Sequence, residues 1–371
     1  MLKKLIMFFI IGFVFKTFAQ EKEVDTIFDE SSRTFLPIPL IINNPTLETA
    51  FGGVGMYFFK FDKEDKKSPP SVANLMGLYS TNKSYVLIAS SRLFWNEDNN
   101  RATIIAGPIK INHNVDYEKE DGEDLHLVYS ELRSIISAEY SRKIFGDFYL
   151  GVLYLGTKTK YKFDQGSEEE NDFTEEFFKE NGITDNFISS IGLNISFDNQ
   201  DYIYNPTKGL MFSIRSKLNR GWLGSDNDYI DTDFTASYFI PLSVGNVLGF
   251  SLAGGIATGD VPFDGYQSYG VRNNLRGYPS GKYRGRNMVA LQAEYRKHIH
   301  KRWGAVAFAG TGSVWGNEDN GEENFERTWL PSVGAGIRYM VSKEKRINLR
   351  LDFAVGVDGN QGMYFGIMEA F

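Results

Sequence analysis

Residues Ile347–Val357 have the sequence INLRLDFAVGV, in which apolar side chains alternate with polar or small ones. Successive side chains of a β-strand point to opposite faces, so this stretch predicts a strand with one apolar and one polar face. The same period of two recurs at 187–198 and 289–295. The composition agrees, because aromatic residues make up 15% of the 371 residues and proline is scarce. We therefore predict an all-β protein.

The length of the predicted strands indicates a transmembrane antiparallel β-barrel rather than a soluble sandwich. They span about ten to fifteen residues, whereas soluble strands average about five or six. Aromatic residues such as Trp303 and Trp315 lie near strand ends, as in interfacial girdles. The mean hydropathy of −0.30 excludes a bundle of membrane helices. The uncharged stretch 234–259 is interrupted by Pro241 and Gly245, so we expect a hairpin there.

Turn residues divide the chain into about sixteen strands, an even number as in bacterial barrels. The expected spans are 35–42, 49–61, 70–80, 84–95, 99–112, 127–142, 147–162, 185–198, 209–219, 228–242, 246–258, 285–298, 302–316, 329–341, 346–357 and 362–371. The longest connections all follow odd-numbered strands: 113–126, 163–184, 259–284 and 317–328. Because such barrels have long outer loops and short periplasmic turns, we expect both termini in the periplasm.

The N-terminus has the pattern of a secretory leader. Lys3 and Lys4 precede the apolar run 5–15, and residues 17–19 are similar to a small-residue cleavage site. A membrane anchor is less favoured, because the run is short for a span and Lys16 interrupts it. The expected division of the chain is a signal peptide at 1–19, a short periplasmic segment at 20–34 and the barrel at 35–371.

Composition excludes several classes of function. The chain has no cysteine, which rules out disulfides, thiol catalysis and a lipoprotein anchor. A formal net charge of −7 argues against general nucleic-acid binding. An exported, acidic barrel is expected in the bacterial cell outer membrane.

Three segments carry a family resemblance. The first is Asp198-Asn199-Gln200-Asp201, followed by Asn205-Pro206-Thr207-Lys208-Gly209. The second is Leu275-Arg276-Gly277-Tyr278, and the third runs from Gly334–Arg338 through Leu351–Ala354 to Phe371. In this order, and over 35–371, they resemble the outer-membrane assembly and translocation barrels that include BamA, TamA and the two-partner secretion transporters.

The resemblance implies a barrel that assists insertion or translocation of protein, or of lipid, at the outer membrane. Gln200 replaces the family's usual Arg, and Gly310 stands where the family tends to have Asp. The POTRA domains that normally precede the barrel have no counterpart in this sequence, so we expect a member without its own POTRA domains. The alternative is a passive pore or structural barrel that retains the family motifs.

The long connection before the twelfth strand is rich in basic residues. Residues 271–286 include five of them and no acid. One interpretation is a solvated loop touching anionic lipid. The other is a loop folded into a polar lumen, where a buried Arg276 must be paired. Glu294 has inward parity, and the resemblance implies that the matching Arg meets an inward Glu and Asp. The residues expected at this site are Arg276, Gly277, Tyr278, Glu294 and, as a lesser partner, Asp352.

The first strand contains two prolines. Pro37 and Pro39 lie two residues apart, so both remove N–H donors from the same edge. If that edge faces the last strand, which is expected to end at Phe371, the seam that closes the barrel is short of hydrogen bonds. Alternatively, the prolines precede the paired part of the strand. A weak lateral seam for client insertion is what the resemblance implies.

No pattern in the sequence indicates an enzyme or a cofactor site. No arrangement of Ser, His and an acid is visible for nucleophilic catalysis. The acidic stretch 167–180 lacks the spacing of a calcium loop and is interpreted as a solvated loop. The expected partners are outer-membrane lipid, client outer-membrane proteins, and a periplasmic or membrane partner or a second copy of the chain, with no nucleic acid.

Overall fold

The computed structural model describes most of the chain. The described residues are 34–44, 47–118, 124–180, 182–268, 275–278, 282–319, 322–324, 329–343 and 345–371. The predicted signal peptide at 1–19 lies outside them, and so does the segment 20–34 apart from Thr34. Both stay predictions.

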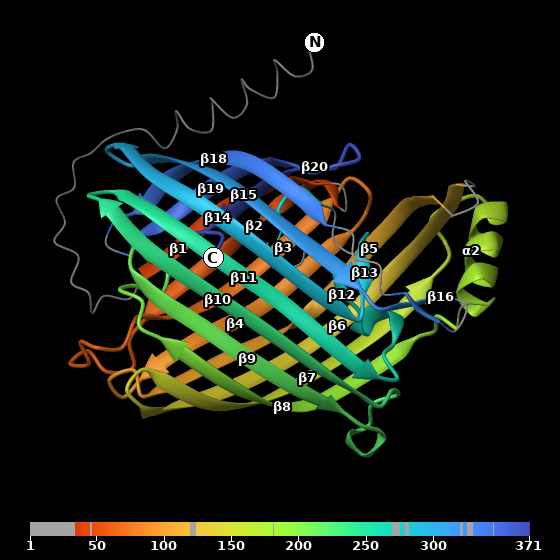
Figure 1. The fold of residues 1–371 in the computed structure, drawn as a ribbon, viewed down its shortest axis with the longest axis horizontal. Helices are drawn as coiled ribbons and strands as arrows, with labels where there is room; N and C mark the ends of the chain where they lie inside the picture. Colours follow the sequence, from red (N-terminus) through yellow and green to blue (C-terminus); the bar gives the residue numbers. More distant parts are fainter. Residues whose placement is uncertain are drawn as a thin grey trace, which may run out of the picture. The chain divides into compact units, whose positions relative to one another are not determined.

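Sixteen antiparallel strands of the described chain form a closed barrel (Figure 1). In barrel order they are β1 (Thr34–Asn44), β2 (Glu48–Phe59), β3 (Ser71–Ser80), β4 (Tyr85–Trp95), β5 (Asn100–Glu118), β6 (Asp124–Phe145), β7 (Phe148–Lys162), β8 (Asn186–Asp198), β9 (Gly209–Asn219), β10 (Tyr229–Ser243), β11 (Asn246–Gly259), β14 (Asn287–His300), β15 (Trp303–Trp315), β18 (Leu330–Ser342), β19 (Ile347–Val355) and β20 (Gln361–Ile367). The predicted fold class and strand number are confirmed.

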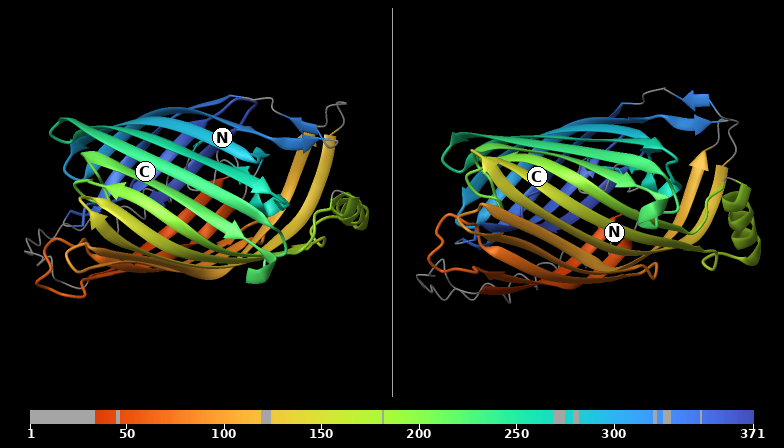
Figure 2. Two further views of the ribbon diagram at one scale, coloured as in Figure 1. Left: turned by 60° about the horizontal axis from the view of Figure 1, so that its bottom comes forward. Right: turned by 90° about the horizontal axis from the view of Figure 1, so that it is seen from below.

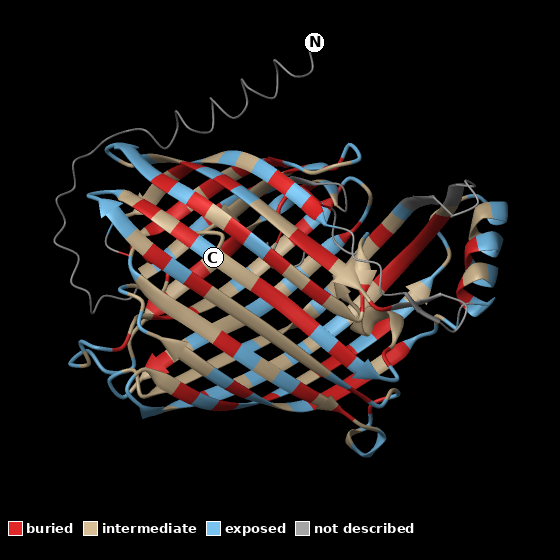
Figure 3. Ribbon diagram, viewed as in Figure 1, coloured by how far each residue is buried: buried red, intermediate tan, exposed pale blue. Residues whose placement is uncertain are grey.

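The alternating sequence explains why these segments pair as they do. In β7 the side chains of Leu150, Val152 and Tyr154 are exposed on the outer surface, and those of Tyr149 and Leu153 are buried. Figure 3 shows the same alternation along neighbouring strands. An apolar outer face suits lipid, and the inward face is free to carry polar groups. No helix in the described ranges is long and apolar enough to cross a membrane.

Two strands extend further than predicted. β5 continues to Glu118, and β6 begins at Asp124. Figure 2 shows the two strands projecting beyond their neighbours, with α2 (Glu168–Glu180) beside them. Smaller elements lie in the long connections. They are the helical turns η1 (Gly221–Leu223) and η2 (Phe263–Gly265) and the short strands β12 (Gln267–Ser268), β13 (Arg284–Gly285), β16 (Asn317–Asp319) and β17 (Glu322–Asn324).

The helix α2 corrects the sequence analysis, which interpreted 167–180 as a solvated loop. Ser167 and Glu170 form a capping box, in which the backbone N–H of Ser167 donates to Glu170 Oε2 at 2.7 Å. Phe178 is 2% exposed and packs against Tyr129 and Tyr161. The cap and this apolar anchor, with Phe177 packed beside it, stabilise a helix that is otherwise rich in acidic residues.

The last strand is also shorter than predicted. β20 ends at Ile367, and Met368 adopts a φ of 67°, which turns the chain away from the sheet. Phe371, expected on the seam, instead lies in the lumen, with its ring 6.1 Å from that of Phe239. Its carbonyl oxygen accepts a hydrogen bond from Arg296. The placement of Phe371 at the seam is therefore wrong.

The helix cap can be tested with Ser167→Ala. Losing an N-cap side chain destabilises a helix by about 1 kcal/mol, so the first turn of α2 should open about fivefold more often. A glutamate-specific protease should then cleave after 168–170 about fivefold faster. The matched control, Ser243→Ala in a short turn, should leave this rate unchanged. Equal cleavage of the Ser167→Ala and control proteins would contradict the capping role.

Candidate functional site

A segment of the long loop after β11 lies inside the barrel. Leu275, Arg276 and Tyr278 are each at most 1% exposed. Gly277 has a φ of 111°, and a Cβ there would come within 3.1 Å of the β19 backbone, so glycine fits this position. The Gly277 N–H donates to Tyr364 Oη at 2.8 Å, and the Tyr278 hydroxyl donates to a β18 carbonyl. The loop is thus bound to β18 and β20 through the two residues that follow Arg276.

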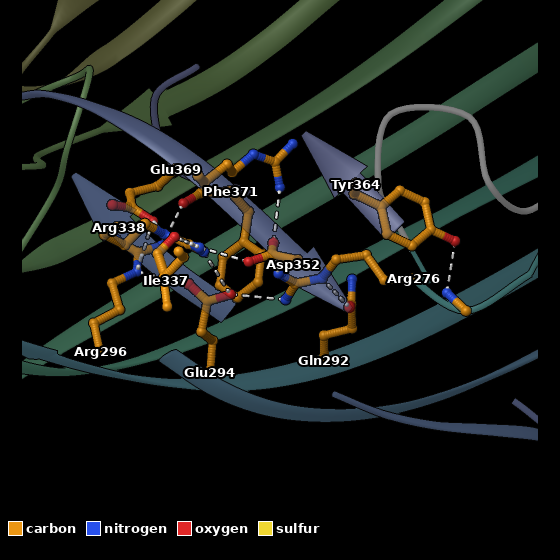
Figure 4. Close-up of polar contacts among 12 residues, drawn as sticks. Arg276, Gln292, Glu294, Arg296, Ile337, Arg338, Asp352, Tyr364, Glu369 and Phe371 are labelled. Atoms are coloured by element: carbon orange, nitrogen blue, oxygen red, sulfur yellow. Dashed lines mark hydrogen bonds and ion pairs between the residues drawn. The ribbon is translucent and has the colours of Figure 1, made fainter. Parts of the chain in front are cut away.

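The Arg276 guanidinium contacts two buried carboxylates (Figure 4). Nη2 lies 2.7 Å from Glu294 Oε2, and Nη1 lies 2.7 Å from Asp352 Oδ2. Nε donates to Gln292 at 3.3 Å, and the ring of Phe308 lies 3.4 Å from the Arg276 Cζ. A buried guanidinium needs such partners, because desolvating it alone costs several kcal/mol. Asp352, expected as a lesser partner, is as close as Glu294.

Three further arginines extend this cluster along the inward faces of the last strands. Arg296 Nε lies 2.8 Å from Glu294, Arg338 bonds Asp352 and Glu369, and Arg350 lies 3.3 Å from Asp352. We call the set the luminal charge cluster. Its members are Arg276, Glu294, Arg296, Arg338, Arg350, Asp352 and Glu369. It connects the loop with β14, β18, β19 and the residues after β20.

Gly310 stands where the resemblance implies an Asp. Its lack of a side chain leaves room for the loop against β15. A Cβ at this position would lie 2.7 Å from Gln292 Cγ and 3.1 Å from Leu275 Cδ1. A larger side chain would therefore displace the loop. Gln292 supplies a polar contact to Arg276 from the neighbouring strand.

The predicted turn motif organises the connection between β8 and β9. Asp201 accepts hydrogen bonds from the backbone N–H of Thr207 at 2.7 Å and of Lys208 at 3.1 Å, and from the Thr207 hydroxyl at 2.8 Å. Gly209 has a φ of 109°, and a Cβ there would lie 2.5 Å from the Asn199 carbonyl oxygen. Asp198 pairs with Arg101 at 2.7 Å. These contacts give the turn one folded conformation.

The same turn reaches strands far from β8 and β9 in the barrel order. Tyr204 donates to the Pro70 carbonyl at 2.6 Å, beside β3. Asp201 lies 3.1 Å from Arg346, and the Pro206 carbonyl accepts a hydrogen bond from Arg296. Because β8 and β9 lie opposite β1 and β20 in the barrel order, the turn crosses one end of the lumen.

The seam between β1 and β20 has few backbone contacts. Successive amides of a strand point alternately to its two neighbours, so Pro37 and Pro39 remove donors from one edge. β1 is aligned with β2 without a gap, which means that the missing donors face β20. In the described ranges β1 and β20 share one aligned pair, Asn43 with Met363, whereas β20 is aligned with β19 over its whole length.

Pro108 shows the same effect within the barrel wall. It is aligned with β6 in an uninterrupted ladder, but the alignment of β4 with β5 has a gap beside it, between Val86 and Ala89. A single proline thus interrupts the ladder on the side that its nitrogen faces. In the register set by Asn43 and Met363, Pro39 falls opposite Ile367, so it removes a donor at the end of β20 and helps to keep the pairing at the seam short.

Side-chain packing joins β1 to the last strands where backbone pairs are missing. Ile38 and Leu40 of β1 belong to a buried apolar cluster. It also includes Ile347 of β19 and Tyr204 of the turn between β8 and β9. Phe365 and other residues of β20 pack against this cluster. Apolar packing is non-directional, so it tolerates separation of the strands better than a hydrogen-bonded ladder does.

Comparison with known proteins shows the family. The model of the Omp85 superfamily domain matches residues 87–371. The chain belongs to the Omp85 superfamily. This membership, together with the barrel, places it in the bacterial outer membrane.

Solved structures of Omp85 barrels have the same fold. BamA from Haemophilus ducreyi lacking POTRA domains 1–3 superposes with a TM-score of 0.56 at 15% identity, over 91% of this chain and 71% of that one. CdiB from Escherichia coli gives 0.59 at 11% identity, and CdiB from Acinetobacter baumannii gives 0.54 at 13%. Each CdiB match covers 90% of this chain, but this Omp85 chain spans only 61% and 59% of the two CdiB chains.

The luminal charge cluster can be tested with Arg276→Ala, Glu294→Ala and the double variant. Arg276→Ala takes the loop's cation from both carboxylates, and Glu294→Ala leaves Arg276 with Asp352 as its one carboxylate, so each single variant should loosen the loop. Thermolysin should then cleave within 259–284 far faster than in wild type. The double variant should be little worse than either single variant, because the two losses share one interaction.

The control for this test is Lys282→Gln, which removes an exposed cation from the same loop. Its cleavage rate should match that of wild type. Fully additive effects of the two alanine substitutions would contradict the pairing. Asp352→Asn should resemble the Glu294 variant, since the two carboxylates are equally close to Arg276.

Acid should loosen the turn between β8 and β9. Burial raises the pKa of Asp201, but hydrogen bonds from Thr207 and Lys208 and the Arg346 guanidinium hold it below its ordinary value of 3.8. Such a carboxylate stabilises the fold fully above 3.8, and the stabilisation is lost as the pH falls through the lower folded value. Hydrogen-exchange protection of the Thr207 and Lys208 amides should fall with acid. Asp201→Asn should remove this dependence, whereas protection that is equally strong in acid and at neutral pH would contradict it.

Proposed function

We propose that this barrel inserts or translocates proteins at the outer membrane through the seam between β1 and β20. Omp85 barrels have a family-level role in outer-membrane protein insertion or translocation, and the chain is a member. The finer assignment to this chain, and to this seam, is our proposal. Lipid is a second substrate class that the same seam could accept.

The observation that carries the proposal is the short pairing of β1 with β20. A strand edge with unpaired backbone groups can accept an added strand from another chain. In lipid such groups have no water to bind, so a client strand that paired with them would be strongly favoured. Among the described residues β20 is aligned with β1 at Met363 alone, although it is aligned with β19 over its whole length, so most of its edge toward β1 lies outside the ladder.

The lumen is partly filled, which favours a barrel that inserts or translocates protein over a wide passive pore. The loop segment 275–278 and the residues after β20 lie within the barrel. A cavity of about 380 Å³ beside the turn, lined by Arg92, Glu139, Arg215 and others, is the observation that favours the passive-pore alternative. We propose no enzymatic role, and client proteins, a periplasmic partner or a second copy of the chain remain proposed partners.

A disulfide across the seam tests this function. The chain has no cysteine, so Asn43→Cys with Met363→Cys introduces one defined pair at the aligned position. In vesicles containing the protein, oxidation should abolish accelerated folding of an added, urea-unfolded eight-stranded outer-membrane barrel. Reduction should restore the acceleration.

The matched control joins β19 to β20 through Phe353→Cys with Met363→Cys, which are also aligned. This disulfide should leave client folding unchanged and should form more completely than the one at the seam. If both locked proteins accelerate client folding like wild type, the seam is not the route. Steady conductance in planar bilayers without acceleration of folding would favour the passive pore.

A further inference from the structure

Lysines continue the outward-facing row of β7 beyond its apolar part. Leu150, Val152 and Tyr154 occupy this row, and Lys158, Lys160 and Lys162 follow on the same face at exposed positions. Side chains two residues apart on a strand share a face and are separated by about 6.6 Å. The three ammonium groups therefore form a column on the outside of the barrel.

The strand register adds a fourth lysine to this column. Lys110 of β5 is aligned with Leu132 of β6, and Leu132 is aligned with Lys160 of β7. Aligned residues of neighbouring strands point to the same face, and two strand spacings amount to about 10 Å. We call Lys110, Lys158, Lys160 and Lys162 the outer lysine patch.

The patch begins at the height where the apolar band of a barrel ends. Phe148 marks the opposite, short-turn end of β7, where its ring lies 4.7 Å from Phe145 and 4.9 Å from Phe197. From Phe148 to Lys158 the strand advances ten residues, which at a tilt of about 40° is a rise of about 25 Å. That is the height of the lipid-facing band, about 25 Å, so the lysines lie at headgroup level.

The lysines of the patch have no ion-pair partner among the described residues. Two carboxylates adjoin the same strand ends: Asp164, which follows β7, and Asp185, which precedes β8. Asp164 accepts hydrogen bonds from Gln165 and Ser130, and Asp185 accepts one from a β7 amide. The pKa of Asp164 is lowered, first by Gln165 and in smaller part by two lysines of the patch. One carboxylate at its edge leaves most of the positive charge of the patch uncompensated.

The neighbouring helix leaves this face open. α2 packs through Phe178 against Tyr129 and Tyr161, whose parity places them on the inward face of β6 and β7. Elsewhere at this end of the barrel, the described outward positions hold aromatic residues such as Tyr79, Trp315 and Trp329. Among the described strand residues at this end, the outward-facing lysines lie on β5 and β7.

We propose that the outer lysine patch binds the phosphate groups of an anionic glycolipid, lipid A, in the outer leaflet. The patch combines uncompensated cations with an adjoining apolar face, and these match the phosphorylated headgroup and the acyl chains of one lipid. The long connection between β7 and β8 follows the patch, and long connections are expected on the outer side of such barrels. This site is independent of the seam and of the function proposed for it.

Lipid retention by the purified, full-length barrel tests this site. Detergent-solubilised protein is titrated with fluorescent diphosphoryl lipid A, and its affinity is compared with that of K158Q/K160Q/K162Q. Each cation near an anionic lipid surface contributes about fivefold, so the triple variant should bind at least about tenfold more weakly. The charge-retaining K158R/K160R/K162R should bind nearly as well as wild type.

Two comparisons make the result decisive. K63Q/K66Q/K343Q removes the same charge from exposed positions in the β2–β3 and β18–β19 connections at the other end of the barrel and should bind lipid A like wild type. Fully dephosphorylated lipid A should bind weakly to every variant. Equal affinity of the triple glutamine variant and wild type would overturn the proposal. So would full competition by inorganic phosphate at the lipid's own concentration, since a lipid site also requires the acyl chains.

Discussion

Hydrocarbon offers no hydrogen-bond partner to a backbone amide, and this constraint determines how the whole chain is arranged. Each strand is aligned with a neighbour on both sides, so the sheet closes, and the buried charged side chains lie on its inward face. The constraint is relaxed at two places, and proline is present at both. Pro108 lies beside a small gap in the wall, and β1, which contains Pro37 and Pro39, has little backbone pairing with β20. The seam between β1 and β20 is where the backbone pairing that the membrane demands is least complete.

A second constraint acts inside the lumen, where charged side chains removed from bulk water need partners of opposite charge. Arg276 enters from a loop and finds Glu294 and Asp352 within 2.7 Å. The cluster continues through Arg338 to Glu369, which lies beyond β20. Loop, wall and chain end are thus held by one set of ion pairs. The apolar cluster around Ile38, which includes Tyr204 of the β8–β9 turn, joins β1 to the last strands in a different way, by packing.

Sequence alone predicted the strands well, because a period of two over long segments has few alternative interpretations. It also indicated that Arg276 needs an inward acid, since an isolated buried guanidinium is unstable. It could not rank Asp352 or find Arg338 and Arg350, because these contacts depend on how neighbouring strands are aligned. The capping box Ser167–Glu170 was a usable signal for α2 that acidic composition obscured. The position of Phe371 depends on the turn at Met368, which no local sequence pattern predicts.

The central claim is that β1 and β20 are joined mainly by side chains rather than by a backbone ladder. Native-state hydrogen exchange of the barrel in lipid nanodiscs measures this most directly, because protected amides report hydrogen bonds that persist. The account predicts that the β20 amides facing β1 exchange much faster than those facing β19, and that β2 and β3 stay protected. Uniform, strong protection across both edges of β20 would contradict it.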